Sequence, residues 1–194
     1  MNKQYFSFNS DGFFMFTTHK QNLSTEKKTL KNISNLYGMD LSNRAKIKQI
    51  HSNNILFAEK PGEYGEFDGI LTNNHQLIPQ IATADCIPLF IYDIVENLYG
   101  VIHCGWRGVL KKIHVHAIEV LISKGCSKNN IKIFSGPSIK KCCYEIGQDI
   151  IHFFHSSCIH NIKKQYYLDL TAQITIDLMN LNIKRYNIAH SNVC

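Results

Sequence analysis

The stretch GVIHCGWRGVLKKI, residues 100–113, decides the fold class, because an apolar run ends within it and a helical pattern begins. The run NLYGVIHCG is typical of a buried strand, and apolar residues recur at helical spacing from Val109 onwards. Gly125 is the expected end of that helix, whose inward face is predicted to hold Val109, Ile113, Ala117, Val120 and Leu121. His103 and Arg107 therefore lie where a strand passes into a helix.

Strand and helix patterns alternate through the rest of the chain. Aromatic-rich segments around Ser10-Asp11-Gly12 predict a hairpin over 6–19. Further strands are expected at 45–58 (two strands or one bent strand), at 87–92 and in the segment 131–139, where the strand runs into a Gly136-Pro137 turn. Helices are expected at 25–36, 144–157 and 169–183, the last capped by Asp169 with Leu170, Ile174, Leu178 and Leu181 inward. This interleaving favours a layered α/β or α+β domain.

Composition indicates an ordinary globular protein. The chain has 194 residues, 44% of them hydrophobic and 19% charged, with no internal repeat or linker, so a single domain over 1–194 is expected. No apolar run approaches the roughly 18 residues of a membrane span, and the N-terminus lacks a signal-peptide pattern. We therefore expect a cytoplasmic protein with no membrane partner. Seven irregularly spaced cysteines indicate reduced thiols rather than a disulfide framework.

The net charge of +6 suits an anionic partner. The lysines come as scattered pairs and not as basic runs interleaved with aromatic residues, so a nucleic-acid partner is not expected. A small phosphorylated or phosphate-dependent substrate would use the same charge.

Three polar residues stand beside strand patterns, where they are candidates for metal ligands. His51 follows a strand pattern, Cys86 precedes the strand IPLFIYD, and His103 ends the strand YGVI. Imidazole and thiolate are preferred zinc ligands, and three protein ligands with one open position are typical of catalytic zinc. Their spacing along the chain does not by itself show that they meet.

The remaining histidine pairs are expected to hold no metal. His114 and His116 point to different sides of the predicted helix and are expected at the surface. His152 and His155 lie three residues apart on another predicted helix, without an evident third ligand.

Other chemical motifs are absent or incomplete. Cys142 and Cys143 lack the C-x-x-C spacing of a redox pair and are expected to be structural or substrate-facing, not metal ligands. The H-x-E and P-C-x-x-C motifs of zinc deaminases are missing, as are the paired histidines of blue-copper oxidases. No phosphate loop or dinucleotide-binding motif is present.

Five motifs occur in order over most of the chain: KQIHSN (48–53), FDGILTN (67–73), ATADCIPLFIYD (82–93), GVIHCGWRG (100–108) and GPSIKKCCYEIG (136–147). Together they resemble the laccase-domain family. Members of that family are labelled polyphenol oxidases and are also described as purine nucleoside phosphorylases with adenosine deaminase and methylthioadenosine phosphorylase activity.

The resemblance implies a fold and a metal site. It implies a four-layer α/β/β/α sandwich with mixed sheets, and a zinc ion held by His51, Cys86 and His103. It also implies a C-terminal segment with Tyr-Arg-Arg and Gly-Arg elements, which this sequence does not contain after Cys194. GPSIKK stands where the family commonly has G-P-x-I-G-P.

Further site residues are expected around that metal. Arg107, at a helix start, is a candidate for binding phosphate or the negative charge of a leaving group, the alternative being a salt bridge. Asp85 and Glu145 are candidates for acid/base work or for orienting the histidines, with a structural role as the alternative. Gln49 and Tyr144 are expected to contact the substrate.

The expected function is phosphorolysis of adenosine, inosine or methylthioadenosine, with deamination of adenosine as a possible second reaction. The enzyme is thus classed as a transferase and hydrolase, a monomer or small homo-oligomer, whose partners are the purine nucleoside and phosphate. One alternative is a copper-dependent, laccase-like oxidoreductase acting on polyphenols. Another is a catalytically weakened nucleoside-binding or regulatory protein, suggested by the missing segment.

Overall fold

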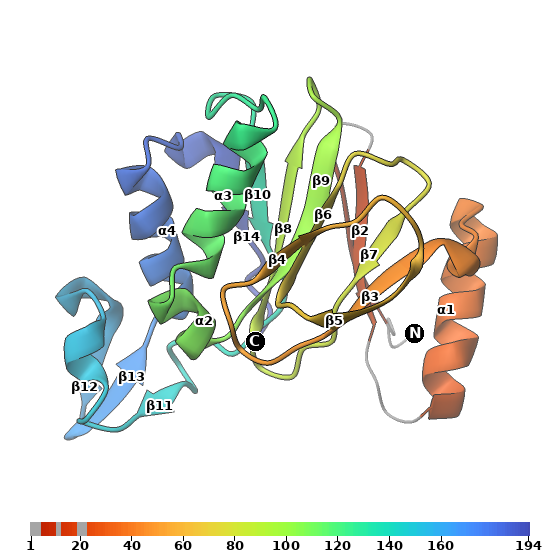
Figure 1. Ribbon diagram of the computed structural model, residues 1–194. Coiled ribbons are helices and arrows are strands. Elements are labelled where there is room, and N and C mark those ends of the chain that lie inside the picture. Colours follow the sequence, from red (N-terminus) through yellow and green to blue (C-terminus); the bar gives the residue numbers. More distant parts are fainter. Residues whose placement is uncertain (1–4, 11–12, 19–22) are drawn as a thin grey trace.

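A six-stranded mixed sheet forms the centre of the molecule (Figure 1). The structure is a computed structural model that describes residues 5–10, 13–18 and 23–194. The pairs β14·β10 and β6·β4 are parallel, and the other neighbours are antiparallel. The strand order is β14 (Ile188–His190), β10 (Lys132–Ser135), β8 (Ile87–Asp93), β9 (Leu98–Cys104), β6 (Gly69–Thr72), β4 (Ile55–Phe57).

Helices cover one face of this sheet and smaller sheets cover the other. Figure 1 shows α2 (Trp106–Leu110), α3 (Ile113–Ser123) and α4 (Leu170–Asn180) on one side. On the other side lie the parallel sheet β5-β3-β7 and the hairpin β1-β2, with α1 (Leu23–Tyr37) outside them. The strands of these sheets are β1 (Tyr5–Ser10), β2 (Phe13–Thr18), β3 (Arg44–Lys48), β5 (Gly62–Glu66) and β7 (Ile78–Gln80). The predicted mixed α/β sandwich is therefore confirmed.

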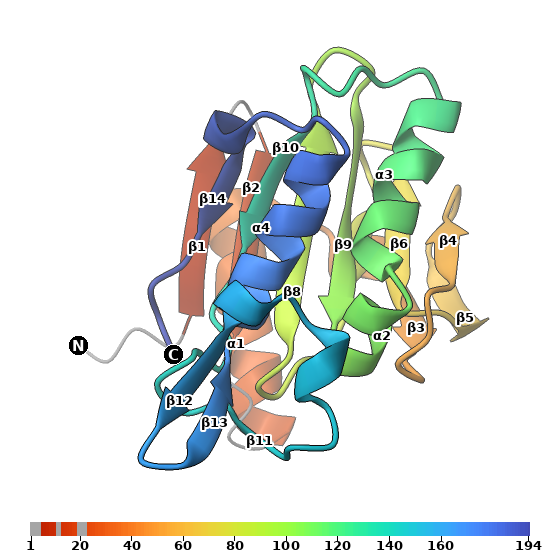
Figure 2. The ribbon, with the colours of Figure 1, turned by 90° about the vertical axis from the view of Figure 1, so that its left-hand side faces the viewer.

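A third small sheet lies at one end of α4 (Figure 2). It is antiparallel, in the order β11 (Glu145–Ile146), β13 (Gln165–Leu168), β12 (Ile159–Ile162). Short 3-10 helices complete the chain: η1 (Leu41–Asn43), η2 (Ile151–Phe153), η3 (Ser156–Cys158) and η4 (Arg185–Asn187).

The helical pattern that follows His103 is confirmed, with one break. Val109 lies on α2, while Ile113, Ala117 and Leu121 lie on α3, and all four side chains are buried. The two helices are separate because Lys112 adopts a left-handed conformation, with φ 61°, that an α-helix does not allow. Val120 is half-buried against the core, and Gly125, at φ 102°, follows the end of α3 as predicted.

The helix predicted over 144–157 is wrong. Glu145 and Ile146 pair with Tyr167 and Tyr166 as β11, and turns and short 3-10 helices follow. Gly147 weakens a helix at this point, and the cross-strand partners lie about twenty residues further along the chain, where local periodicity does not reveal them.

The other predicted elements are confirmed. The hairpin pairs Tyr5 with Thr18 through Ser10 with Phe13, although its turn residues 11–12 lie outside the described part of the chain. Residues 45–58 form two strands, β3 and β4, which belong to different sheets. Asp169 caps α4 by accepting a hydrogen bond from the backbone N–H of Ala172. Within the described ranges, no helix is both long and apolar enough to span a bilayer.

Candidate metal centre

The side chains of His51, Cys86 and His103 converge at one end of the central sheet. Their ligand atoms all lie within 4.8 Å of one another. His103 is on β9, opposite Pro88 of β8, so the antiparallel register brings Cys86 to the same end of the sheet. His51 reaches them from the loop after β3. The imidazole rings of His51 and His103 are 4.7 Å apart and nearly perpendicular. The structure thus brings together the three predicted ligands.

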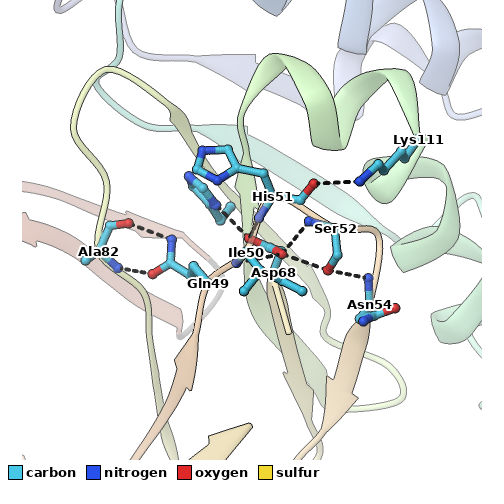
Figure 3. A network of polar contacts seen from close by, with 9 residues as sticks. Gln49, Ile50, His51, Ser52, Asn54, Asp68, Ala82 and Lys111 are labelled. Atoms are coloured by element: carbon cyan, nitrogen blue, oxygen red, sulfur yellow. Dashed lines mark hydrogen bonds and ion pairs between the residues drawn. The ribbon is translucent and has the colours of Figure 1, made fainter. Parts of the chain in front are cut away.

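Asp68, from the segment that precedes β6, organises two of these ligands (Figure 3). It is fully buried, and its Oδ1 lies 2.9 Å from Nδ1 of His103. Its carboxylate also accepts hydrogen bonds from the backbone N–H groups of Ile50, His51 and Ser52 and from the Ser52 hydroxyl. One carboxylate therefore fixes both the ring of His103 and the backbone that carries His51.

The charge of Asp68 favours a defined tautomer of His103. Burial by itself raises the pKa of Asp68, but the hydrogen bonds from His103, Ser52 and His51 outweigh burial and lower the pKa below its usual value. An ionised carboxylate only accepts hydrogen bonds, so the Nδ1 atom of His103 carries the proton. The Nε2 atom is then left with a lone pair for a metal ion.

Gly105 leaves the space in which the three ligands meet. A Cβ atom at this position would lie 2.8 Å from Cδ2 of His51 and 3.0 Å from Sγ of Cys86. Any other residue would therefore push the ligands apart. Gly105 is also the residue before α2, so the strand turns into the helix directly beside the site.

The loops that carry His51 and Cys86 are held in uncommon conformations and tied together. His51 has φ 58° and Asp85 has φ 70°, a left-handed conformation that non-glycine residues adopt rarely. The side-chain amide of Gln49 donates to the backbone oxygen of Ala82 at 2.7 Å and accepts from its N–H at 2.8 Å (Figure 3). Gln49, predicted to bind substrate, thus joins the His51 loop to the Cys86 loop.

The electrostatics of the site favour a bound cation. Burial raises the pKa of Cys86, and the charges of Asp85 and Asp68 raise it further. A thiolate at this position therefore needs a positive charge nearby. Two imidazoles and one thiol form a donor set that suits a metal ion such as zinc. They meet in the space that Gly105 leaves free, which we call the ligand cradle.

Arg107 lies exposed on α2, two residues after Gly105. Its guanidinium carbon stacks 4.3 Å from the ring centroid of Trp106. In the part of the chain that the structure describes, no carboxylate forms an ion pair with Arg107. The salt bridge weighed as the alternative role is therefore not formed among these residues.

The charge of Asp85 affects the pKa of Tyr144, whereas Glu145 forms a hydrogen bond with another residue. Burial, followed by the charges of Cys86 and Asp85, raises the pKa of Tyr144 to about 12, against an opposing effect of Arg107. The carboxylate of Glu145 accepts a hydrogen bond from Gln165 across β11 and β13. Of the two predicted acid/base residues, only Asp85 adjoins a predicted ligand in the chain.

The other histidine pairs lie outside this site. The surface position predicted for His114 is wrong: its side chain is fully buried, and Nε2 lies 3.0 Å from Oδ2 of Asp177 on α4. It is buried because α3 packs against α4 on that side. His116 is half-buried, and its Nδ1 lies 2.8 Å from the backbone oxygen of Asn53. His152 and His155 are exposed.

The sequence is similar to proteins of one known family. The sequence matches the family described as multi-copper polyphenol oxidoreductase laccase over residues 5–194. A Clostridium acetobutylicum protein named purine nucleoside phosphorylase is 29% identical over 98% of this chain and 84% of its own length. Bacillus subtilis YlmD, which carries the same name, is 32% identical over 66% of this chain, and the match spans 49% of YlmD.

Solved structures share the fold. The hypothetical protein YfiH from Bacillus licheniformis superposes with a TM-score of 0.81 at 23% identity, over 92% of this chain and 73% of YfiH. YlmD from Geobacillus stearothermophilus gives 0.78 at 20% identity, over 84% of this chain and 68% of its own. With its five motifs, its layered fold and a family match over nearly its whole length, the chain belongs to the multi-copper polyphenol oxidoreductase laccase family.

Proposed function

We propose that this protein is a zinc-dependent purine nucleoside phosphorylase. The reaction consumes phosphate and a nucleoside such as inosine, adenosine or methylthioadenosine, and releases the purine and the sugar 1-phosphate. The observation that carries the proposal is the convergence of His51, Cys86 and His103 within 4.8 Å, beside an exposed Arg107. The names of the Clostridium and Bacillus relatives support the choice of reaction.

Zinc is the metal that the donor set suits best. Two nitrogen ligands and one sulfur ligand are borderline-soft, and His51, Cys86 and His103 would leave one position for solvent or substrate. A zinc ion held there supplies positive charge and Lewis acidity. Asp68 keeps His103 in the tautomer that can bind it.

The remaining residues are assigned by their positions. Arg107 binds phosphate, because its guanidinium presents paired N–H donors that match phosphate oxygens and lies on the helix beside the ligand cradle. Tyr144 is assigned to nucleoside binding, because the charges of both Cys86 and Arg107 affect its pKa. Asp85 transfers a proton to or from the purine, while Glu145 is structural through its contact with Gln165.

Deamination of adenosine is a second reaction that the same site can support. It requires a water made nucleophilic and a group to move its proton, and Asp85 would serve the latter role. Phosphate is not a reactant in this case, so the two reactions are separable by omitting phosphate.

The test is product analysis with inosine, adenosine and methylthioadenosine, with and without phosphate. We expect the purine and the sugar 1-phosphate to appear together, only when phosphate is present. Nucleoside binding without any product would identify a binding protein instead. Copper in the isolated protein, with oxygen uptake on phenols, would identify the oxidase that the family description names.

A further inference from the structure

Three exposed cysteines form a second cluster of ligand atoms, separate from the candidate metal centre. The sulfur atoms of Cys142 and Cys143 are 3.3 Å apart. Cys194 lies 3.8 Å from Cys143 and 4.0 Å from Cys142, measured between sulfurs. All three cysteines are free and exposed, whereas the cysteines outside both clusters, Cys104, Cys126 and Cys158, are buried.

The pairing of β10 with β14 brings Cys194 to the other two. The strands are parallel, so the segments that follow them leave the sheet at the same edge. The backbone N–H of Ser191 donates to the oxygen of Ser135 at 2.7 Å, and that of Ser138 donates to the oxygen of Val193 at 3.3 Å. The two segments therefore run side by side up to the cluster.

A tight turn places the adjacent cysteines at the end of the other segment. The backbone N–H groups of Cys143 and Tyr144 both donate to the oxygen of Lys140 at 2.9 Å. The turn brings the sulfurs of Cys142 and Cys143 together on the side that Cys194 approaches.

We propose that Cys142, Cys143 and Cys194 form a second metal site, which binds one zinc ion through three thiolates. Tetrahedral zinc with sulfur at about 2.3 Å holds its sulfur ligands about 3.8 Å apart. The three observed separations, 3.3, 3.8 and 4.0 Å, bracket this value. A point about 2.3 Å from all three sulfurs exists about 0.8 Å outside their plane, as the centre of a tetrahedron requires.

Metal binding at the cluster is coupled to proton release. Zinc binds thiolates, so each cysteine of the cluster that is protonated in the free protein releases its proton to solvent as it becomes a ligand.

This inference replaces the expectation that Cys142 and Cys143 hold no metal. That expectation considered only their adjacent spacing, and the third thiol is about fifty residues away in sequence. The site also adjoins the candidate metal centre through the chain: the N–H of Ile139 donates to the oxygen of Asp85 at 2.9 Å. A metal ion on the three thiols would fix the segment that leads into Tyr144.

Cobalt(II) titration of the reduced, metal-stripped protein tests the second site. Cobalt replaces zinc in tetrahedral thiolate sites and gives a sulfur-to-cobalt absorption band in the near ultraviolet. The titration is made on Cys86→Ser, which has no thiolate at the candidate metal centre. We expect the band to appear and to saturate at about one equivalent. Zinc should displace the cobalt and abolish the band.

Adding Cys194→Ser to the Cys86→Ser protein should weaken cobalt binding at least about tenfold and reduce the absorption band. Cys126→Ser is the matched control, because burial raises the pKa of Cys126 to about 12 and the residue lies outside the cluster; the band should be unchanged. Circular dichroism checks that each variant is folded. Absence of the band in Cys86→Ser, or a band of full strength after Cys194→Ser, would overturn the proposal.

Discussion

Asp68 and His103 form a buried pair in which the carboxylate Oδ1 lies 2.9 Å from the imidazole Nδ1. The pair links the sheet to the predicted metal ligands, since His103 belongs to β9 and Asp68 also binds the backbone of the His51 loop. The hydrogen bonds of Asp68 thus orient both the ring of His103 and the loop that carries His51.

The first prediction concerns this pair. Asp68→Asn keeps the shape but removes the charge, so His103 loses its fixed tautomer and zinc affinity should fall about 10- to 100-fold. Competition with a chromophoric chelator measures the affinity, in protein that also carries Cys194→Ser. Asp93→Asn is the control, because Asp93 is a buried carboxylate at the other end of β8. Equal affinities in Asp68→Asn and the parent protein would contradict the assigned role.

The second prediction concerns the ligand cradle at Gly105, where His51 and Cys86 meet. Gly105→Ala places a methyl group against His51 and Cys86, so metal content should fall while the fold is retained. Gly65→Ala is the matched control, because a Cβ atom there has no neighbour within 4 Å. Zinc analysis after dialysis, in protein that also carries Cys194→Ser, distinguishes the two variants. Full zinc content in Gly105→Ala would show that the three side chains do not meet around one ion.

The third prediction concerns Arg107. Loss of a charge-assisted contact to phosphate costs roughly 1.5 to 3 kcal/mol, so Arg107→Ala should raise the KM for phosphate about ten- to a hundredfold. Arg107→Lys should restore only part of this, because an ammonium group lacks the paired donors. Deamination should suffer less, since it uses no phosphate. An equal fall in both activities with zinc retained would rule out a phosphate-binding role.

The fourth prediction concerns stability against acid. Burial, followed by the charges of Arg185 and Lys140, lowers the pKa of His190 from 6.5 to about 4. The unfolded chain therefore takes up a proton at a higher pH than the folded chain. The free energy of unfolding should fall as the pH drops from about 6.5 to about 4. Urea unfolding at pH 7 and pH 5 measures this, and His190→Gln should reduce the difference. An unchanged difference in His190→Gln would contradict the effect.

The sequence predicts those parts of the fold whose pattern is local. The β9 strand, the α2–α3 face and the Asp169 cap follow from periodicity and from one capping residue. The segment 144–157 does not, because its pairing with Tyr166 and Tyr167 is decided by a distant strand. His114 is buried for a similar reason: α4 covers it through Asp177.

The candidate site likewise contains residues that the sequence indicates and residues that only the fold brings into place. His51, Cys86 and His103 were expected through motif resemblance, since nothing in their spacing shows that they meet. Asp68 was missed, although FDGILTN places an acidic residue directly before a strand, where a buried carboxylate needs a partner. Cys194 was missed because only the parallel pairing of β10 with β14 brings it to Cys142.

The central claim is that His51, Cys86 and His103 hold the metal on which nucleoside phosphorolysis depends. The direct test measures sugar 1-phosphate formed from inosine and phosphate by metal-stripped protein as zinc is added, for the parent chain and for Cys86→Ser. We predict no product without zinc, recovery of activity on adding zinc to the parent chain, and no recovery in Cys86→Ser at any zinc concentration. Product formed by the stripped parent chain without added zinc, or recovery of Cys86→Ser to the parent level on adding zinc, would contradict the claim.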